Sequence, residues 1–173
     1  PYLQKATLSI EDSGFYSHGG VSITGILRSL VTDIVRMSFA QGGSTITQQV
    51  VKNTILTGKK SIVRKVQEWV LAIRLENRYT KDQILEFYFN VTPYGGTIYG
   101  AESASRAFYG KSAKDLDLAE SAYLAAIPQL PTYYSPYGNN RAALDARKNI
   151  VLSRMKELGY ITDEQYKQAK EEK

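Results

Sequence analysis

Apolar residues recur at intervals of three and four positions along much of the chain, and this spacing restricts the fold more than any other feature. In one run that starts at Ile23, the apolar positions are Ile26, Leu27, Leu30, Val31, Ile34 and Val35. In a second run, after Ser61, they are Ile62, Val66, Trp69, Val70 and Ile73. This period gathers side chains on one face of an α-helix. Because no two segments alternate as paired strands do, the sequence predicts a mainly α fold.

Helix starts are marked by residues whose side chains accept hydrogen bonds from the first turn. The helices expected from these signals begin at Ser44, at Ser61, at Thr80 with Gln83, and at Thr162 with Gln165. The first of them should reach about Leu56. Shorter helices are expected near residues 101–108 and 116–127. A long helix from about Arg141 should end at Gly159, because glycine readily adopts the left-handed conformation that closes a helix.

The length and apolar content of the chain fit one folded domain. With 173 residues, 43% of them hydrophobic, the chain can bury a substantial core. It has no cysteine and one histidine, which excludes disulfides, thiolate metal sites and clusters of histidine ligands. The longest uncharged stretch, residues 121–140, contains prolines and is not expected to cross a membrane as an unbroken helix. We expect one domain over residues 1–173, with any membrane anchor outside this chain.

A net charge of +5 favours a negatively charged partner. Nucleic acid, an acidic membrane surface and a phosphorylated substrate all fit this charge. The basic residues are interspersed with acidic ones, and no known nucleic-acid motif is present. Nucleic acid is therefore not expected as a partner.

Two adjacent carboxylates, Glu11 and Asp12, follow the apolar segment 6–10, and Phe15 and His18 come soon after. Acidic side chains oppose the negative end of the helix dipole, so helix stability does not explain this position. A partly buried carboxylate there would have a raised pKa and could accept a proton near neutral pH. The alternative is that one carboxylate caps the next turn and that His18 is a hydrogen-bonded core residue.

A glycine pair, Gly42 and Gly43, precedes the helix start expected at Ser44. Exposed backbone N–H groups at such a start suit a phosphate or sugar oxygen. Thr45, Gln48, Gln49 and Lys52 follow in the same segment. The alternative is that Ser44 only caps the helix.

Basic residues gather where the next helix is expected to begin. They are Lys59, Lys60, Arg64 and Lys65, and Glu68 follows them. Cations in the first turn of a helix are unfavourable by about 0.3–1 kcal/mol each unless an anion lies among them. Arg64 and Glu68 form an i,i+4 pair in the less favourable order, so salt bridging explains the cluster poorly. We infer a bound phosphate group, with a solvated basic face as the alternative.

The segment from Lys81 to Asn90 is interpreted as structural. Ile84, Leu85 and Tyr88 share one face of the expected helix, as core residues do. Asn90 is expected near the helix end.

Taken together and in this order, the four segments closely resemble the peptidoglycan glycosyltransferases, which occur in bifunctional penicillin-binding proteins and as monofunctional enzymes. The residues that carry the resemblance are Glu11-Asp12-x-x-Phe15-x-x-His18-x-Gly20, Gly43-Ser44-Thr45-x-Thr47-Gln48-Gln49, Arg64-Lys65-x-x-Glu68 and Lys81-x-x-Ile84-Leu85-Glu86-x-Tyr88-x-Asn90. The match covers nearly the whole chain. Phe89 stands where the family commonly has Leu, and Phe108-Tyr109 where it commonly has Tyr-Phe; both differences keep apolar bulk.

The resemblance implies a lysozyme-like, two-lobed α-helical fold with a large head lobe and a small, membrane-associated jaw lobe. The jaw subregion corresponds to about residues 21–41. The wide apolar stripe of segment 22–40 could rest among lipid headgroups, with Arg28 and Arg36 against anionic lipid. An ordinary core helix is the alternative for this segment.

The resemblance also implies a role for each motif residue. Glu11 matches the general base, and Glu68 is a second carboxylate that orients the site or helps to bind metal or acceptor. The residues expected to bind substrate or shape the cleft are Asp12, Phe15, His18, Ser44, Thr45, Gln48, Gln49, Lys52, Lys60, Arg64 and Lys65. A divalent ion, Mg²⁺ or Mn²⁺, near Glu68 and the pyrophosphate is an open alternative, and no organic cofactor is expected. The arrangement expected is a proton acceptor facing a positively charged cradle across one groove.

The expected partners are lipid II, the growing lipid-linked glycan chain, an anionic membrane surface, a transpeptidase domain in the full-length protein and moenomycin-type inhibitors. The expected location is the outer face of the bacterial cytoplasmic membrane, with an N-terminal anchor outside this chain. Two other functions stay open: a lysozyme-like muramidase, and a noncatalytic module that binds glycan or membrane. The muramidase would leave the basic cluster unexplained, because its substrate lacks pyrophosphate.

Overall fold

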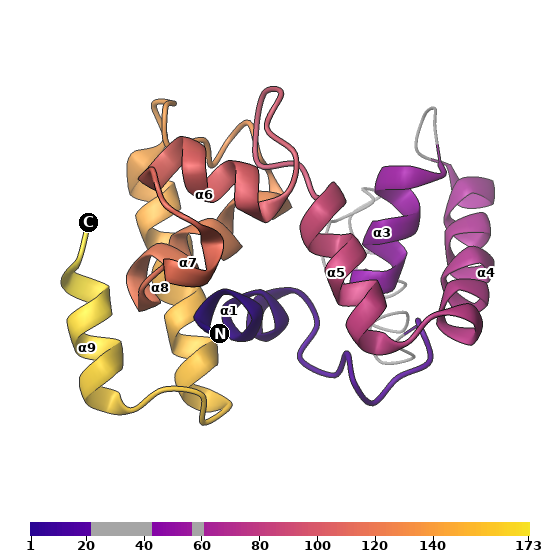
Figure 1. Cartoon of the computed structure of the whole chain (residues 1–173), viewed down its shortest axis with the longest axis horizontal. Coiled ribbons are helices and arrows are strands. Elements are labelled where there is room, and N and C mark those ends of the chain that lie inside the picture. The colour runs from indigo at the N-terminus through magenta and orange to yellow at the C-terminus, as the bar shows by residue number, and fades with distance from the viewer. Residues whose placement is uncertain (22–42, 57–60) are drawn as a thin grey trace. The chain divides into compact units, whose positions relative to one another are not determined.

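The computed structural model describes residues 1–21, 43–56 and 61–173. The regular elements assigned in these ranges are helices, and Pro93 and Tyr99 form an isolated antiparallel bridge. The prediction of a mainly α fold is therefore confirmed. The elements are α1 (Tyr2–Glu11), α3 (Ile46–Thr54), α4 (Ile62–Arg78), α5 (Lys81–Val91), α6 (Ala101–Tyr109), the 3-10 turn η1 (Ala113–Asp115), α7 (Leu118–Ala126), the 3-10 turn η2 (Ile127–Gln129), α8 (Arg141–Glu157) and α9 (Asp163–Glu171) (Figure 1).

The chain divides into two compact units. Unit 1 consists of residues 1–13 and 92–173, and unit 2 of residues 14–91. The expectation of one domain over residues 1–173 stays a prediction. Lys60, the helix expected after Ile23 and nearly all of the expected jaw subregion lie outside the described residues. Within the described ranges, no helix combines the length and apolar character needed to span a membrane.

Most of the helix signals in the sequence lie where they were expected. Hydroxyl groups of Ser61, Thr80 and Thr162 each accept a hydrogen bond from the N–H three residues later, at 3.1–3.2 Å. Gly159 closes α8 with φ +75°, the left-handed conformation expected of it. These local signals succeed because the bonding groups are only three residues apart in the chain.

The helix start expected at Ser44 is wrong by one residue. Thr45 is the capping residue of α3: its hydroxyl accepts a hydrogen bond from the Gln48 N–H at 3.1 Å. The Gln48 side chain accepts one in return from the Thr45 N–H at 2.7 Å. A capping box joins positions three apart, so Gln48 fixes the start at Thr45. The Ser44 hydroxyl instead accepts a hydrogen bond from Lys65 Nζ at 2.7 Å.

Unit 1 is built around α7, which is buried along nearly its whole length. α1, α8 and α9 all contact it, and α1 also packs against α8. Small residues let these helices approach closely; in α7 they are Ala119, Ser121, Ala122, Ala125 and Ala126. The buried face of α1, with Leu3, Ala6 and Leu8, is removed from water by this packing.

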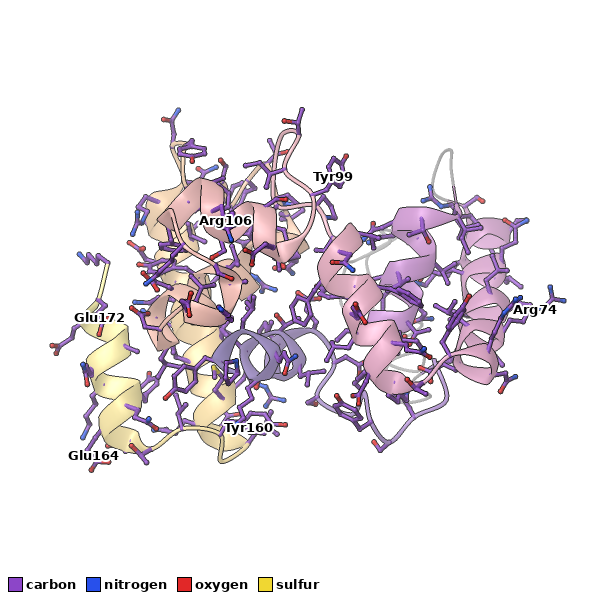
Figure 2. The ribbon with its side chains drawn as sticks, viewed as in Figure 1. Arg74, Tyr99, Arg106, Tyr160, Glu164 and Glu172 are labelled. Carbon is purple, nitrogen blue, oxygen red and sulfur yellow. The ribbon has the colours of Figure 1, made fainter. Side chains whose placement is uncertain are left out.

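In unit 2, α3 packs against α4 and α5. Ile84, Leu85 and Tyr88 of α5 are buried, which confirms their predicted place in the core. The buried residues of α4 are Glu68 and Ala72, whereas its apolar residues Ile62, Val63, Val66, Val70 and Ile73 are 45–72% exposed. The apolar stripe predicted for α4 therefore does not form the core of this unit, because α4 turns its Glu68 face inward. Figure 2 shows Arg74, also exposed, extending away from α4.

The C-terminal end of α9 is held by a buried cation. Lys148 of α8 is 1% exposed, and its Nζ donates hydrogen bonds to the carbonyl oxygens of Ala169, Lys170 and Glu172 at 3.0, 3.0 and 2.7 Å. Removal from water lowers the pKa of Lys148, and the nearby Asp145 carboxylate opposes this shift. A positive charge at the end of a helix satisfies carbonyls that have no partner within the helix.

We expect Lys148→Met to lower the free energy of unfolding by about 1–3 kcal/mol, because the carbonyls at the end of α9 lose their shared donor. Urea denaturation would measure the loss, and hydrogen exchange should show it concentrated in α9. Lys167→Met is the control, since Lys167 is 73% exposed and pairs with Asp163 on the surface. Equal losses in the two variants would contradict this account of Lys148.

Candidate functional site

Glu11 is the last residue of α1, and Asp12 is the C-capping residue that follows it. The side chain of Glu11 is 12% exposed, so the carboxylate lies at the edge of the core of unit 1. The Asp12 N–H donates to the Leu8 carbonyl at 3.0 Å and so completes the last helical turn. The predicted position of both carboxylates at the end of an apolar helix is confirmed.

Arg147 of α8 forms an ion pair with Glu11. Its Nη2 lies 3.6 Å from Glu11 Oε1, and its own side chain is 13% exposed. Arg147 was missed in the sequence analysis, because it lies in none of the segments with unusual charge or glycine patterns. The two residues are far apart in the chain, and only the packing of α1 on α8 brings them together.

Tyr94 is a second neighbour of Glu11 that the sequence did not indicate. Its side chain is 1% exposed, and its hydroxyl has no hydrogen-bond partner among the residues that the structure describes. Burial raises the pKa of Tyr94 well above its usual range, and the negative charge of Glu11 adds to the shift. The hydroxyl therefore stays protonated beside the carboxylate.

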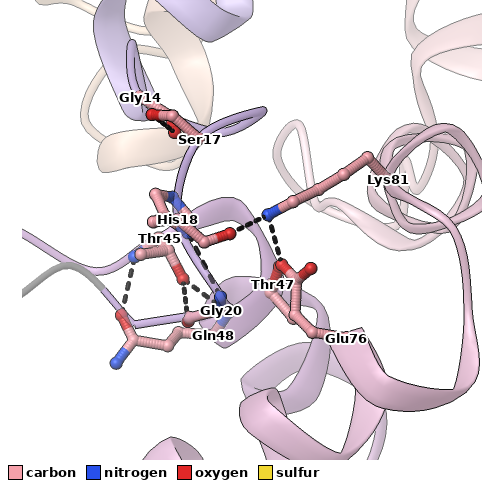
Figure 3. A network of polar contacts seen from close by, with 9 residues as sticks. All are labelled: Gly14, Ser17, His18, Gly20, Thr45, Thr47, Gln48, Glu76 and Lys81. Atoms are coloured by element: carbon pink, nitrogen blue, oxygen red, sulfur yellow. Dashed lines mark hydrogen bonds and ion pairs between the residues drawn. The ribbon is translucent and has the colours of Figure 1, made fainter.

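In unit 2, the first motif is tied to the start of α3 through Gly20. The Gly20 carbonyl accepts a hydrogen bond from the Thr45 hydroxyl at 2.7 Å, and its N–H donates to His18 Nδ1 at 3.2 Å (Figure 3). Gly20 has φ +87°, and a Cβ at this position would lie 2.7 Å from Glu76 Cγ and 2.9 Å from the Ala72 carbonyl oxygen. Glycine is required here by both the conformation and the close approach of α4.

Lys81 joins this network from the start of α5. Its Nζ donates to the His18 carbonyl and to Glu76 Oε1, the second at 2.8 Å. The same Glu76 oxygen accepts a hydrogen bond from the Thr47 hydroxyl at 2.6 Å (Figure 3). Lys81 also lies 4.6 Å from the ring centroid of Phe15, which is 1% exposed. One ammonium group thus holds together residues from the first, second and fourth motifs.

A second polar network connects α4 with Ser44, two residues before α3. Lys65 Nζ donates to Glu68 Oε1 at 2.8 Å and to the Ser44 hydroxyl at 2.7 Å. Glu68 is 4% exposed. The ion pair at Glu68 Oε1 joins Lys65, because positions i and i+3 share a face of the helix.

The predicted site residues are therefore divided between the two units. Glu11 and Asp12 lie in unit 1, and those in the described part of unit 2 are Phe15, His18, Ser44, Thr45, Gln48, Gln49, Lys52, Arg64, Lys65 and Glu68. Thr45 and Gln48 are 2% exposed and cap α3, so both have a structural task. Lys52 and Arg64 are partly exposed. The substrate contacts expected of all these residues stay predictions.

Metal ligation has little support in the described residues. There, no group of three or more His, Cys, Asp and Glu side chains is placed to hold a metal ion. Glu68 is already engaged with Lys65. Pyrophosphate oxygens could complete the ligand set of a divalent ion beside Glu68.

Comparison with known proteins found relatives of this chain in the family that its motifs resemble. A family model described as transglycosylase matches residues 1–156. Penicillin-binding protein 1A of Clostridium botulinum is 45% identical over 175 residues, which cover 96% of this chain and 21% of that protein. The protein of the same name from Escherichia coli K12 is 42% identical over 173 residues, covering 99% of this chain and 20% of that protein.

A solved structure is also similar. The crystal structure of penicillin-binding protein 1A from Haemophilus influenzae aligns with a TM-score of 0.52 and 28% sequence identity, over 74% of this chain and 16% of that chain. The chain thus spans about a fifth of the length of the curated relatives it matches.

We expect Gly20→Ala to lower the free energy of unfolding by about 2–4 kcal/mol, because the added methyl group meets α4 and the backbone is left-handed. Gly19→Ala is the matched control, since a Cβ at Gly19 would have no heavy atom within 4 Å. Thermal or urea unfolding would measure both. Similar stabilities for the two variants would contradict the close packing described at Gly20.

Tyr94→Phe should leave the free energy of unfolding unchanged or raise it by about 1 kcal/mol, because a buried hydroxyl without a partner is removed. Tyr123→Phe is the matched comparison: its hydroxyl donates to Asp145 at 2.6 Å, and its loss should cost about 1–3 kcal/mol. Urea denaturation of both variants tests the difference. A larger loss for Tyr94→Phe than for Tyr123→Phe would show that the Tyr94 hydroxyl is bonded.

Proposed function

The chain belongs to the transglycosylase family, and on this basis we propose that it is a peptidoglycan glycosyltransferase. Its substrate is lipid II, a disaccharide linked to undecaprenyl pyrophosphate, and its product is a growing lipid-linked glycan strand. The match of the family model over residues 1–156 supports the proposal, as do relatives 42–45% identical over nearly the whole chain. The partly buried position of Glu11 at the end of α1 supports a chemical role for this carboxylate.

In the proposed reaction, Glu11 is the general base. It takes the proton from the 4-hydroxyl of the acceptor sugar, and that oxygen attacks the anomeric carbon of the donor chain. The bond between the anomeric carbon and the pyrophosphate oxygen breaks, and the anomeric configuration is inverted. Undecaprenyl pyrophosphate leaves with the bonding electron pair.

Cations take the place of a general acid in this reaction. A glycosidase must protonate its leaving oxygen, whereas pyrophosphate leaves as a stabilised anion. Lys52, Arg64 and Lys65 are proposed to neutralise the charge that develops on the pyrophosphate, together with Lys60.

The basic residues beside Glu68 favour transfer over hydrolysis. A muramidase substrate lacks pyrophosphate, so it would leave these cations without a role. Glu68 is the second motif carboxylate, and Lys65 Nζ lies 2.8 Å from its Oε1. In this position Glu68 can orient Lys65 or the acceptor.

The remaining assignments follow from the family. Ser44, Thr45, Gln48 and Gln49 are proposed to hold phosphate or sugar oxygens, with Asp12, Phe15 and His18 shaping the groove. If a divalent ion takes part, Glu68 would hold it and the ion would add positive charge beside the pyrophosphate; a chelator would then lower turnover. We further propose that the enzyme acts at the outer face of the bacterial cytoplasmic membrane, is joined to a transpeptidase domain and is inhibited by moenomycin-type compounds.

The decisive experiment supplies the protein with lipid-linked disaccharide in one reaction and with finished glycan in another. Growth of long strands in the first reaction supports transfer. Shortening of strands in the second would favour a muramidase. Binding without either change would favour a noncatalytic module.

We expect Glu11→Gln to lower polymer formation by about 10²–10⁴-fold, because the amide cannot accept the proton. Binding of lipid-linked disaccharide should change little, since the two side chains have nearly the same shape, and the urea midpoint reports the cost of leaving Arg147 without its charged partner. Glu164→Gln removes one negative charge from the exposed start of α9 and is the control (Figure 2). Turnover of Glu11→Gln above a few per cent of wild type would remove Glu11 from the role of base.

A further inference from the structure

Arg147 is held in a fixed orientation beside Glu11. Its Nε donates a hydrogen bond to the carbonyl oxygen of Ala126, the last residue of α7, at 2.9 Å. The guanidinium carbon lies 5.6 Å from the ring centroid of Tyr134. The planar guanidinium is thus held by α7 on one edge and by an aromatic ring on one face, which leaves little freedom for Nη2.

The ion pair between Arg147 and Glu11 lies inside unit 1 and is largely shielded from water. Both side chains are only 12–13% exposed, so salt and solvent screen their attraction much less than at the surface. Burial disfavours a charged carboxylate, and the nearby guanidinium favours it. Arg147 therefore offsets the cost of keeping Glu11 ionised at the edge of the core.

The distance between Arg147 and Glu11 suits a carboxylate that must accept a proton. At 3.6 Å, Nη2 and Oε1 lie beyond ordinary hydrogen-bond distance. A short bidentate contact with arginine would occupy both oxygens and oppose proton uptake. The observed contact stabilises the charge of Glu11 and orients its carboxylate, although Nη2 and Oε1 form no hydrogen bond with each other.

Neighbouring cations on α8 have other partners. Lys148 is turned toward the carbonyls at the end of α9, and Arg141 binds Asp145 at 2.9 Å. Arg154 forms an ion pair with Glu157 at 2.6 Å and is 42% exposed. Among these basic residues of α8, Arg147 is the one whose contacts lead to the proposed base.

We propose that Arg147 is a positioning residue for Glu11: anchored on Ala126 and Tyr134, it fixes the orientation of the carboxylate toward the acceptor hydroxyl. This inference rests on the proposed function of Glu11 as general base. It assigns no substrate contact to Arg147. Loss of Arg147 should therefore slow the chemical step more than it weakens substrate binding.

The test compares Arg147→Ala, Arg147→Lys and Arg154→Ala in a steady-state polymerisation assay with lipid-linked disaccharide. We expect Arg147→Ala to lower kcat by about 10²-fold, with a KM close to that of wild type, because a displaced base loses much of its effect. Arg147→Lys should show a smaller loss of kcat, since lysine keeps the charge but not the planar contacts with Ala126 and Tyr134. Arg154→Ala should keep wild-type kcat.

Chemical rescue separates positioning from general structural support. Guanidinium ion at low millimolar concentration, well below denaturing levels, should restore part of the kcat of Arg147→Ala and leave Arg154→Ala unchanged. Glu11→Gln combined with Arg147→Ala should be no slower than Glu11→Gln alone and should not be rescued, because the two residues act through one step. Urea denaturation of each variant shows how much protein is folded in the assay.

The results distinguish failure of the role of Arg147 from failure of the proposed function. Wild-type kcat in Arg147→Ala, or a loss confined to KM, would overturn the role of Arg147 while leaving the proposed function intact. If Arg147→Ala does not fold, a wild-type kcat in Arg147→Lys would overturn it instead. A wild-type protein that forms no polymer, or a fully active Glu11→Gln, would overturn the proposed function itself.

Discussion

The packing of α1 against α7 and α8 is the constraint on which the candidate site depends. Leu3, Ala6 and Leu8 must leave water, and the small residues of α7 let α1 approach closely enough to bury them. Glu11 lies at the end of the same helix, so this packing draws its carboxylate to the edge of the core. A carboxylate there faces both burial and the negative end of the helix dipole. Arg147, which the same packing brings within 3.6 Å, opposes both effects.

Unit 2 shows that residues of the family motifs hold the fold together. Buried polar groups must find hydrogen-bond partners, and in this unit many of the partners are other motif residues. Thr45 bonds to Gly20 and Gln48, and Lys81 bonds to His18 and Glu76 (Figure 3). A change at one of these positions disturbs several segments together. Loss of activity alone therefore does not identify a residue that touches substrate, and stability must be measured beside turnover.

The charge arrangement fits the proposed leaving group. Two lysines of unit 2 each pair with a carboxylate, Lys65 with Glu68 and Lys81 with Glu76. Such pairs fix the position of the cations, which reduces the reorganisation needed when an anion develops nearby. As a leaving group, pyrophosphate is stabilised by fixed positive charge, whereas a sugar leaving group would need a proton.

The sequence by itself determined the helices and most of their ends, because capping and helical periodicity depend on residues three or four apart. It also determined the family, because four motifs in the same order carry that information. Its error at the start of α3 was local, because Gln48 places the cap of that helix at Thr45. Only the tertiary structure showed that Arg147 pairs with Glu11, that Tyr94 is buried within reach of the charge of Glu11, and that most of the apolar stripe of α4 is exposed. These facts depend on which faces of distant helices pack together, and no spacing within a single helix specifies that choice.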